Sequence, residues 1–250
     1  MYLIKASYGN DSMALIQWMH EQGHGGVSHV VYNDTGWSRA GWVERVTAGE
    51  ALAASYGMTV HRTHASFVDA CRLKRAFPAH GMQFCTTMLK IEPTLRLFDA
   101  LDPAREWIAV VGVRREESAR RAAWPEVTEA SPLDGGRESW APLVRHTQAQ
   151  RDELLLRAGV QPLPHRSDEC WPCVNANRAD VRRVADSDPE RIAEIDALER
   201  ELSEGHDVRR RMFRETASIG EHVAWAQSAP RGYVEGQRFL FGCDGGFCGT

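Results

Sequence analysis

The chain has 250 residues, of which 43% are hydrophobic and 26% are charged, and its formal net charge is -4 at pH 7. That length suits an α/β core with a small appendage, and the weak negative charge excludes a general attraction to nucleic acid or to acidic membranes. No apolar run is long enough to span a bilayer and no signal segment opens the sequence, so we expect a cytoplasmic protein with no membrane partner.

Short apolar runs alternate with helical patterns through the first two-thirds of the chain. This alternation predicts an α/β fold with a mostly parallel, five-stranded sheet flanked by helices. The strands are expected at residues 2–6, 27–33, 58–63, 107–113 and 139–143. Prolines and closely spaced cysteines interrupt the pattern after residue 160. This change of pattern therefore predicts an α/β domain at 1–160 and a helical, irregular, cysteine-containing extension at 161–250.

The first predicted strand ends in the polar turn Ser7-Tyr8-Gly9-Asn10-Asp11-Ser12, and an apolar-periodic helix follows. The start of such a helix directs unpaired backbone N–H groups and the positive end of the helix dipole at one point. The turn therefore predicts an anion site. The lysine of the common nucleoside-triphosphate loop is absent, and an ordinary polar turn is the alternative.

Polar residues also follow the second and the fourth predicted strands. Asp34, Thr35 and Gly36 follow the second strand, and a segment rich in arginine and glutamate, residues 112–121, follows the fourth. The carboxyl ends of parallel strands meet at one sheet edge, so these groups are expected to converge there. The alternatives are a simple turn at Asp34 and an i,i+4 ion pair within residues 112–121.

The first turn resembles the pyrophosphate-binding PP-loop, S-G-G-x-D-S, of the ATP pyrophosphatase and phosphoadenosine phosphosulfate (PAPS) reductase superfamily, with Tyr8 replacing one glycine. Two further blocks are similar to PAPS reductases, namely C-x-x-x-L-K-x-x-P at residues 85–93 and G-x-R-x-x-E-S-x-x-R at residues 112–121. The blocks cover most of the first 175 residues in family order. The resemblance implies a PP-loop fold of the adenine nucleotide alpha hydrolase type.

By this resemblance, Lys90 and Arg114 neutralise phosphate or sulfate charge, and Asp34 lies near the ribose or a metal ion. The residues that the resemblance assigns to the nucleotide are Ser7, Tyr8, Gly9, Asn10, Asp11, Ser12, Asp34, Thr35, Gly36, Gly112, Arg114, Glu117, Ser118 and Arg121.

Six cysteines without a secretion signal indicate metal ligands or reactive thiols rather than disulfides. Cys170 and Cys173 form a C-x-x-C turn, which needs two further ligands to hold a metal or cluster. Iron–sulfur sulfonucleotide reductases and the sulfur-transfer enzymes of DNA phosphorothioation pair such a turn with a cysteine in the lysine block, here Cys85. The tandem Cys-Cys of the reductases is Phe84-Cys85 in this chain, which leaves one ligand unassigned.

Cys243 or Cys248 can complete a [4Fe-4S] set, and we prefer Cys243. Zinc is the alternative to the cluster, with His165 or His206 as a nitrogen ligand.

The first functional hypothesis is activation of Mg²⁺-bound ATP. Ser7 and Ser12 would hold the pyrophosphate, Asp11 and Asp34 would retain Mg²⁺, and an acceptor oxygen would attack the α-phosphorus. Sulfur transfer onto the adenylated acceptor would follow, with Asp11 and Lys90 as catalytic residues. A carboxylate at position 11 favours a metal-bound triphosphate because it would repel a bare sulfonucleotide.

The second hypothesis is thiol-dependent reduction of PAPS or adenylyl sulfate, in which Cys248 attacks the sulfate sulfur. Tyr8 fits this alternative, whereas the terminal E-C-G-L-H segment of the reductases is absent. A third hypothesis is a non-catalytic nucleotide- or cluster-binding module of a larger complex.

The sequence leaves the partners open. The acceptor is a small molecule or a nucleic acid, and the arginine cluster within residues 209–214 would guide the latter. A sulfur-donor or thiol-reductant protein is a further expected partner. The oligomeric state is undetermined, with a homodimer among the alternatives.

Overall fold

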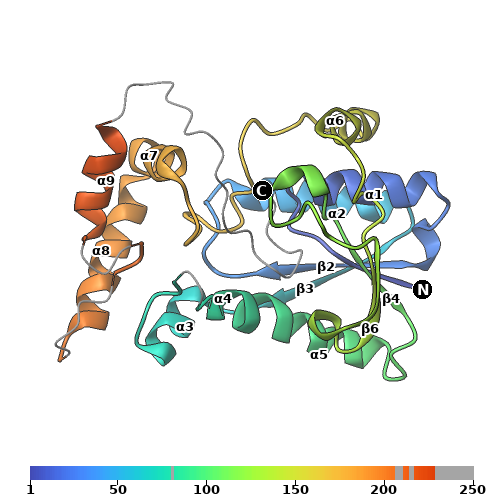
Figure 1. The fold of residues 1–250 in the computed structure, drawn as a ribbon, viewed down its shortest axis with the longest axis horizontal. Coiled ribbons are helices and arrows are strands. Elements are labelled where there is room, and N and C mark those ends of the chain that lie inside the picture. The colour runs from blue at the N-terminus through green and yellow to red at the C-terminus, as the bar shows by residue number, and fades with distance from the viewer. Residues whose placement is uncertain (80–81, 206–210, 214–216, 229–250) are drawn as a thin grey trace.

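A computed structural model describes residues 1–79, 82–205, 211–213 and 217–228 (Figure 1). In these ranges the chain forms one six-stranded sheet in the order β3-β2-β1-β4-β6-β5. Only the pairing of β5 with β6 is antiparallel. The predicted α/β class with a mostly parallel sheet is therefore confirmed. The strands are β1 (Tyr2–Lys5), β2 (Ser28–Asp34), β3 (Thr59–His64), β4 (Ile108–Val111), β5 (Val127–Ser131) and β6 (Arg137–Trp140).

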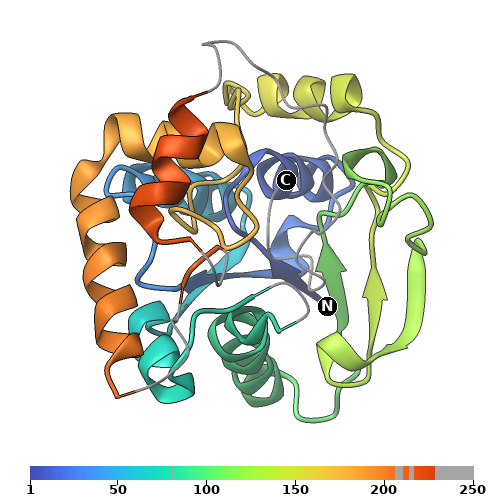
Figure 2. The same ribbon diagram turned by 60° about the vertical axis from the view of Figure 1, so that its left-hand side comes forward.

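Helices cover both faces of the sheet (Figures 1 and 2). Ile4 and Val110 pack with α1, α2 and α6 on one face, whereas Leu3 and Ala109 pack with Phe98 of α5 on the other. This alternation follows from the period of two along a strand, and it buries both faces of the central strands. The helices before residue 160 are α1 (Asn10–Glu21), α2 (Trp42–Ser55), α3 (Phe67–Lys74), α4 (Phe84–Thr86), α5 (Glu92–Leu101) and α6 (Gln148–Arg157), with a π-helical turn, η2 (Thr87–Ile91), between α4 and α5.

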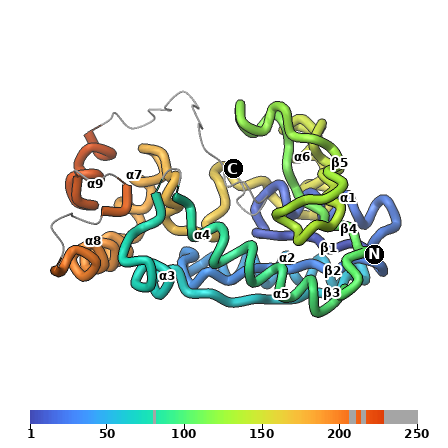
Figure 3. The backbone as a smooth tube through the Cα atoms, turned by 60° about the horizontal axis from the view of Figure 1, so that its bottom comes forward, coloured from blue at the N-terminus to red at the C-terminus, as the bar shows by residue number. Residues whose placement is uncertain are grey.

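The C-terminal helices form a separate group at one end of the molecule, beside α3 (Figure 3). They are α7 (Arg178–Ser187), α8 (Pro189–Ser203) and α9 (Ile219–Gln227). Ile195 and Leu198 of α8 pack in a core with Trp37, Phe67 and Cys71. Cys71 is fully buried in α3, so it serves there as a small apolar side chain. None of the described helices is both long and apolar enough to cross a membrane.

The sequence predicted five strands and missed β5. Val127 and Glu129 are exposed in this strand, and β5 pairs only with β6, at the sheet edge. An exposed edge strand needs no apolar alternation, so its sequence carries little strand signal. The predicted residues Cys243, Cys248 and His206 lie outside the described residues, and the division at residue 160 stays a prediction.

The Tyr8 ring packs into the core instead of facing solvent. Tyr8 has a positive φ of 56° and is fully buried, and a Cβ added to Gly49 of α2 would lie 2.2 Å from its Cδ1 atom. Glycine at position 49 therefore makes room for the aromatic ring below the predicted anion loop.

Gly49→Ala should lower the free energy of unfolding by about 2 kcal/mol, because the new methyl group overlaps the Tyr8 ring. Gly26→Ala is the matched control, since nothing lies within 4 Å of its added Cβ. Urea denaturation of both variants measures the difference, and equal stability would contradict the packing described.

Candidate nucleotide and thiol site

The turn after β1 leaves the start of α1 open to an anion. Gly9 precedes the helix with an extended backbone, and no side chain caps it, whereas Thr147, Asn177 and Ser218 cap α6, α7 and α9. The Ser7 hydroxyl accepts the Gly9 N–H at 3.3 Å. The first-turn N–H groups of α1 therefore form a candidate anion site, and phosphate binding there stays a prediction.

Two side chains of the predicted loop point away from this anion position. The Tyr8 ring lies in the core at 5.7 Å from the Tyr32 ring, and burial raises the pKa of Tyr8. The Asn10 amide forms two hydrogen bonds of 2.9 Å with the backbone N–H and C=O of Leu163. Only the backbone groups of Tyr8 and Asn10 can therefore contribute to the candidate anion site, and their side chains hold the loop in place.

Asp11 lies in a buried ion pair with Arg114. Its Oδ1 atom is 2.5 Å from Arg114 Nε, and its Oδ2 atom is 3.9 Å from Arg151 Nη1 of α6. A Cβ added to Gly112 would lie 3.2 Å from the Asp11 carbonyl oxygen, so the end of β4 abuts α1. The structure thus brings the two predicted blocks together, but it directs the Asp11 carboxylate at arginines. Arg151 carried no recognisable motif in the sequence.

Within residues 112–121, Glu117, Ser118 and Arg121 hold Arg114 in position. Glu117 accepts the Arg114 N–H at 2.6 Å and forms a buried ion pair with Arg121. The Ser118 hydroxyl accepts the Arg121 N–H at 3.3 Å. The i,i+4 ion pair is therefore present, but it is buried beside a short 3-10 turn, Arg115–Glu117, and is not part of a solvated helix.

The turn after β2 divides its residues between solvent and the interior. Asp34 accepts the Gly36 N–H at 2.9 Å and contacts His64 at 3.1 Å, and 45% of its side chain stays exposed. Gly36 adopts a positive φ of 61°. Thr35 is fully buried and donates a 3.3 Å hydrogen bond to the Glu169 carbonyl. Asp34 is therefore a partly exposed carboxylate at the end of β2.

Residues 161–169, which we call the connector, cross from the phosphate loop to the C-x-x-C turn. Arg45 of α2 donates to the Tyr8 carbonyl at 3.1 Å and to the Gln161 carbonyl at 3.4 Å. At the far end, both Asp168 oxygens bind Arg183 of α7, at 2.7 and 3.0 Å. These bonds hold the loop and the C-x-x-C turn in one arrangement.

A buried ion pair joins the connector to the lysine block. Lys90 Nζ is 2.6 Å from Glu169 Oε2, both side chains are 3% exposed, and Glu169 Oε1 has no hydrogen-bond partner among the described residues. Burial raises the pKa of Glu169, against the effect of Lys90. Burial alone would lower the pKa of Lys90, but Cys170 and Glu169 raise it on balance. Sequence reasoning missed Glu169, because a lone glutamate before a cysteine fits no spacing rule.

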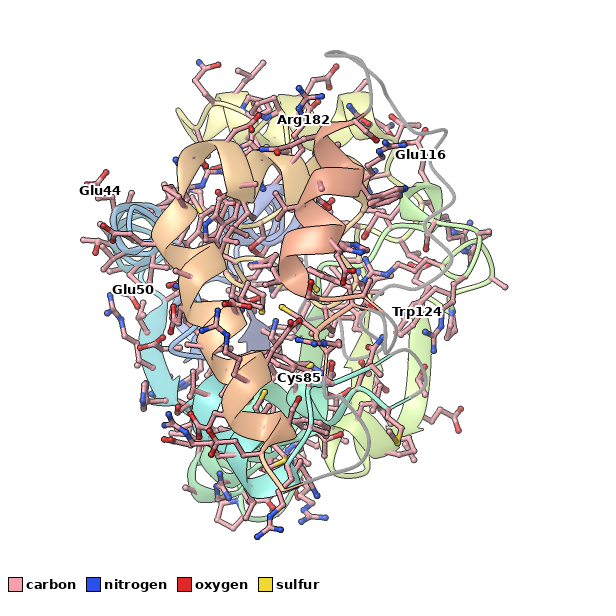
Figure 4. The ribbon with its side chains drawn as sticks, turned by 90° about the vertical axis from the view of Figure 1, so that its left-hand side faces the viewer. Glu44, Glu50, Cys85, Glu116, Trp124 and Arg182 are labelled. Carbon is pink, nitrogen blue, oxygen red and sulfur yellow. The ribbon has the colours of Figure 1, made fainter. Side chains whose placement is uncertain are left out.

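Three predicted cysteines line one small cavity beside this ion pair, and Cys85 lies near the centre of the view in Figure 4. Burial raises the pKa of Cys85 to about 11 and that of Cys170 to about 12. These thiols must lose protons before they can bind a metal. The cavity is lined by Trp37, Phe67, Cys85, Thr86, Leu89, Lys90, Cys170, Pro172, Cys173 and Val174.

Within the described residues, no three side chains of His, Cys, Asp or Glu are grouped so that they could hold a metal ion. Cys243, the preferred fourth cysteine of the predicted set, lies outside the described residues. His165 lies in the connector, where its Nδ1 atom is 2.8 Å from the Arg166 carbonyl.

A mostly parallel sheet with helices on both faces defines an α/β protein, and the uncapped helix start after its first strand is its candidate anion site. The chain belongs to the phosphoadenosine phosphosulfate reductase domain family, whose sequence model matches residues 2–171. That match covers the sheet, the phosphate loop, the connector and Cys170.

The chain is also 30% identical, over 141 residues, to an uncharacterised 37.8 kDa protein in the gpa 5' region of Escherichia phage 186. The aligned part covers 54% of this chain and 42% of the phage protein. The chain thus spans less than half of that relative.

Asp11→Asn should lower the free energy of unfolding by about 3 kcal/mol, because it removes the nearer carboxylate from the buried Arg114 guanidinium and leaves only Glu116, at 3.4 Å. Asp34→Asn, at an exposed carboxylate, should change it by less than about 0.5 kcal/mol. Urea denaturation distinguishes the two. An Asp11→Asn variant with unchanged stability and weaker Mg²⁺-ATP binding would instead identify Asp11 as a metal ligand.

Proposed function

We propose that the protein binds Mg²⁺-ATP, cleaves it at the α-phosphate to adenylate an acceptor, and supports sulfur transfer to the activated acceptor. The proposal rests on the path of the connector. It joins the phosphate loop at Asn10 and Leu163 to a cavity lined by Cys85, Cys170 and Cys173. Sulfur chemistry beside a nucleotide site is what such a reaction requires.

In this proposal the phosphate loop binds the β- and γ-phosphates through Ser7, Ser12 and the first N–H groups of α1. Arg114 supplies positive charge at the neighbouring strand end, and Asp11 holds its guanidinium in place. Mg²⁺ keeps several waters and takes one or two protein carboxylates together with phosphate oxygens. Asp34, which is exposed, suits this role better than Asp11, whose oxygens face arginines.

The acceptor oxygen attacks the α-phosphorus in line with the bond to the leaving pyrophosphate. A new oxygen–phosphorus bond forms, the bond to the bridging oxygen breaks, and pyrophosphate leaves with the bonding electrons. Positioning and charge neutralisation account for most of the catalysis in such a step. Lys90 lines the thiol cavity and pairs with Glu169 of the connector, so in this proposal it would balance negative charge there.

Cys85, Cys170 and Cys173, with Cys243 as a fourth ligand, would hold a [4Fe-4S] cluster, and zinc is the alternative. Thiolates suit soft and borderline metals, so the residue types agree with both, but the three described cysteines are not grouped closely enough in this structure to hold either one. Lys90 beside the thiols offsets the negative charge that thiolates bring. A bound cluster would supply electron or sulfur transfer.

Sulfonucleotide reduction is the second candidate function, with Cys248 as nucleophile and a thiol-reductant protein as partner. One observation favours sulfonucleotide reduction over ATP activation. Arg114 and Arg151 both face the Asp11 carboxylate, so the loop does not present a free negative charge to a bare sulfonucleotide. A non-catalytic binding module is the third alternative.

The purified protein should release pyrophosphate from Mg²⁺-ATP, and Lys90→Met should reduce the rate at least about 100-fold. Because Lys90→Met leaves Glu169 buried without its partner, the double variant Lys90→Met/Glu169→Gln is the stability control. It should fold and remain inactive. Sulfite release from PAPS with a thiol reductant, without pyrophosphate release from ATP, would favour the reductase instead.

Protein purified without oxygen should contain iron and sulfide, and Cys85→Ser, Cys170→Ser or Cys173→Ser should each lose most of both. Cys71→Ser is the matched control, because Cys71 is buried in α3 and does not line the cavity. Metal analysis and visible absorbance measure the outcome. Stoichiometric zinc in a colourless protein would show that the cysteines bind zinc and not an iron–sulfur cluster.

A further inference from the structure

We propose that Ser167, a connector residue, is an additional phosphate-binding residue of the loop at Ser7 to Ser12. The ligand is the terminal part of a nucleoside triphosphate. This inference rests on the proposed nucleotide function. It adds a residue of the connector to the residues that contact the phosphates.

Ser7 and Ser167 both lie close to the Cβ position of Gly9. A Cβ added to Gly9 would lie 3.4 Å from Ser7 Oγ, 3.2 Å from Ser167 Cβ and 3.8 Å from Ser167 Oγ. Gly9 is the residue directly before α1, where an anion would meet the first N–H groups of the helix. The Ser167 hydroxyl therefore lies next to the predicted phosphate position, although 158 residues separate it from Gly9 along the chain.

The hydrogen-bonding state of Ser167 leaves its proton available. Its Oγ atom accepts the Glu169 N–H at 3.2 Å, and within the described residues no hydrogen bond uses its O–H as a donor. A serine hydroxyl has one donor and two acceptor positions. Ionised phosphate oxygens accept hydrogen bonds. The Ser167 hydroxyl, whose oxygen already accepts the Glu169 N–H, can donate its proton to one of them.

The neighbours of Ser167 hold it in this position. Asp168 is fixed by two hydrogen bonds from Arg183, and Glu169 is fixed by Lys90. Upstream, Leu163 is bonded to Asn10 of the loop itself. A hydroxyl that is held in place before binding loses little side-chain entropy when it contacts a phosphate.

Isothermal titration with a non-hydrolysable Mg²⁺-ATP analogue and with AMP tests the assignment. Ser167→Ala should weaken binding of the analogue at least about 10-fold and change AMP binding less than about 2-fold, because AMP lacks the β- and γ-phosphates. Ser167→Cys, of similar size but with a weaker donor, should give an intermediate affinity. Ser55→Ala, at an exposed serine of α2, is the matched control and should bind like the wild type.

Wild-type affinity in Ser167→Ala would overturn the assignment while leaving the proposed function intact. An equal loss of analogue and AMP binding would also overturn it, since it would show a general disturbance of the site. A wild-type protein that binds no adenine nucleotide would overturn the proposed function together with this inference. Thermal unfolding of each variant verifies that the comparison is between folded proteins.

Discussion

The pair of hydrogen bonds between the Asn10 side chain and the Leu163 backbone connects the two halves of the site. Asn10 begins α1, and Leu163 begins the approach of the chain to the C-x-x-C turn. A side-chain amide that satisfies both a backbone donor and a backbone acceptor fixes distance and orientation together. The loop geometry, the path of the connector and the position of the thiol cavity all depend on this junction.

Electrostatic neutralisation is the second constraint at this sheet edge. Asp11 is paired with Arg114, Lys90 with Glu169, and Asp168 with Arg183. Buried ion pairs contribute little net stability, but removing one partner leaves an uncompensated buried charge. Asp11 also faces Arg151, and Asp168 also faces Arg39, so each of these carboxylates contacts two arginines. In the proposed function, backbone N–H groups and neutral hydroxyls would add to the arginines in recognising an anion.

The location of the site could be predicted from the sequence, whereas the orientation of several side chains could not. A strand, a polar turn and an amphipathic helix place an anion site at the sheet edge whatever the side chains do, and C-x-x-C spacing indicates a thiol site in the same way. The inward Tyr8 ring depends on Gly49 in a distant helix, and the second arginine facing Asp11, Arg151, depends on the packing of α6. Glu169 became recognisable only when tertiary structure placed Lys90 against it.

The separation of 153 residues between Asn10 and Leu163 has a consequence for how the protein folds. Contacts between distant parts of a chain form late, because the entropy of closing a long loop must be overcome first. The sheet strands β1, β2 and β3 can pair while the connector is still unattached. During synthesis, the Asn10 side chain therefore gains its backbone partner only after Leu163 has been added to the chain.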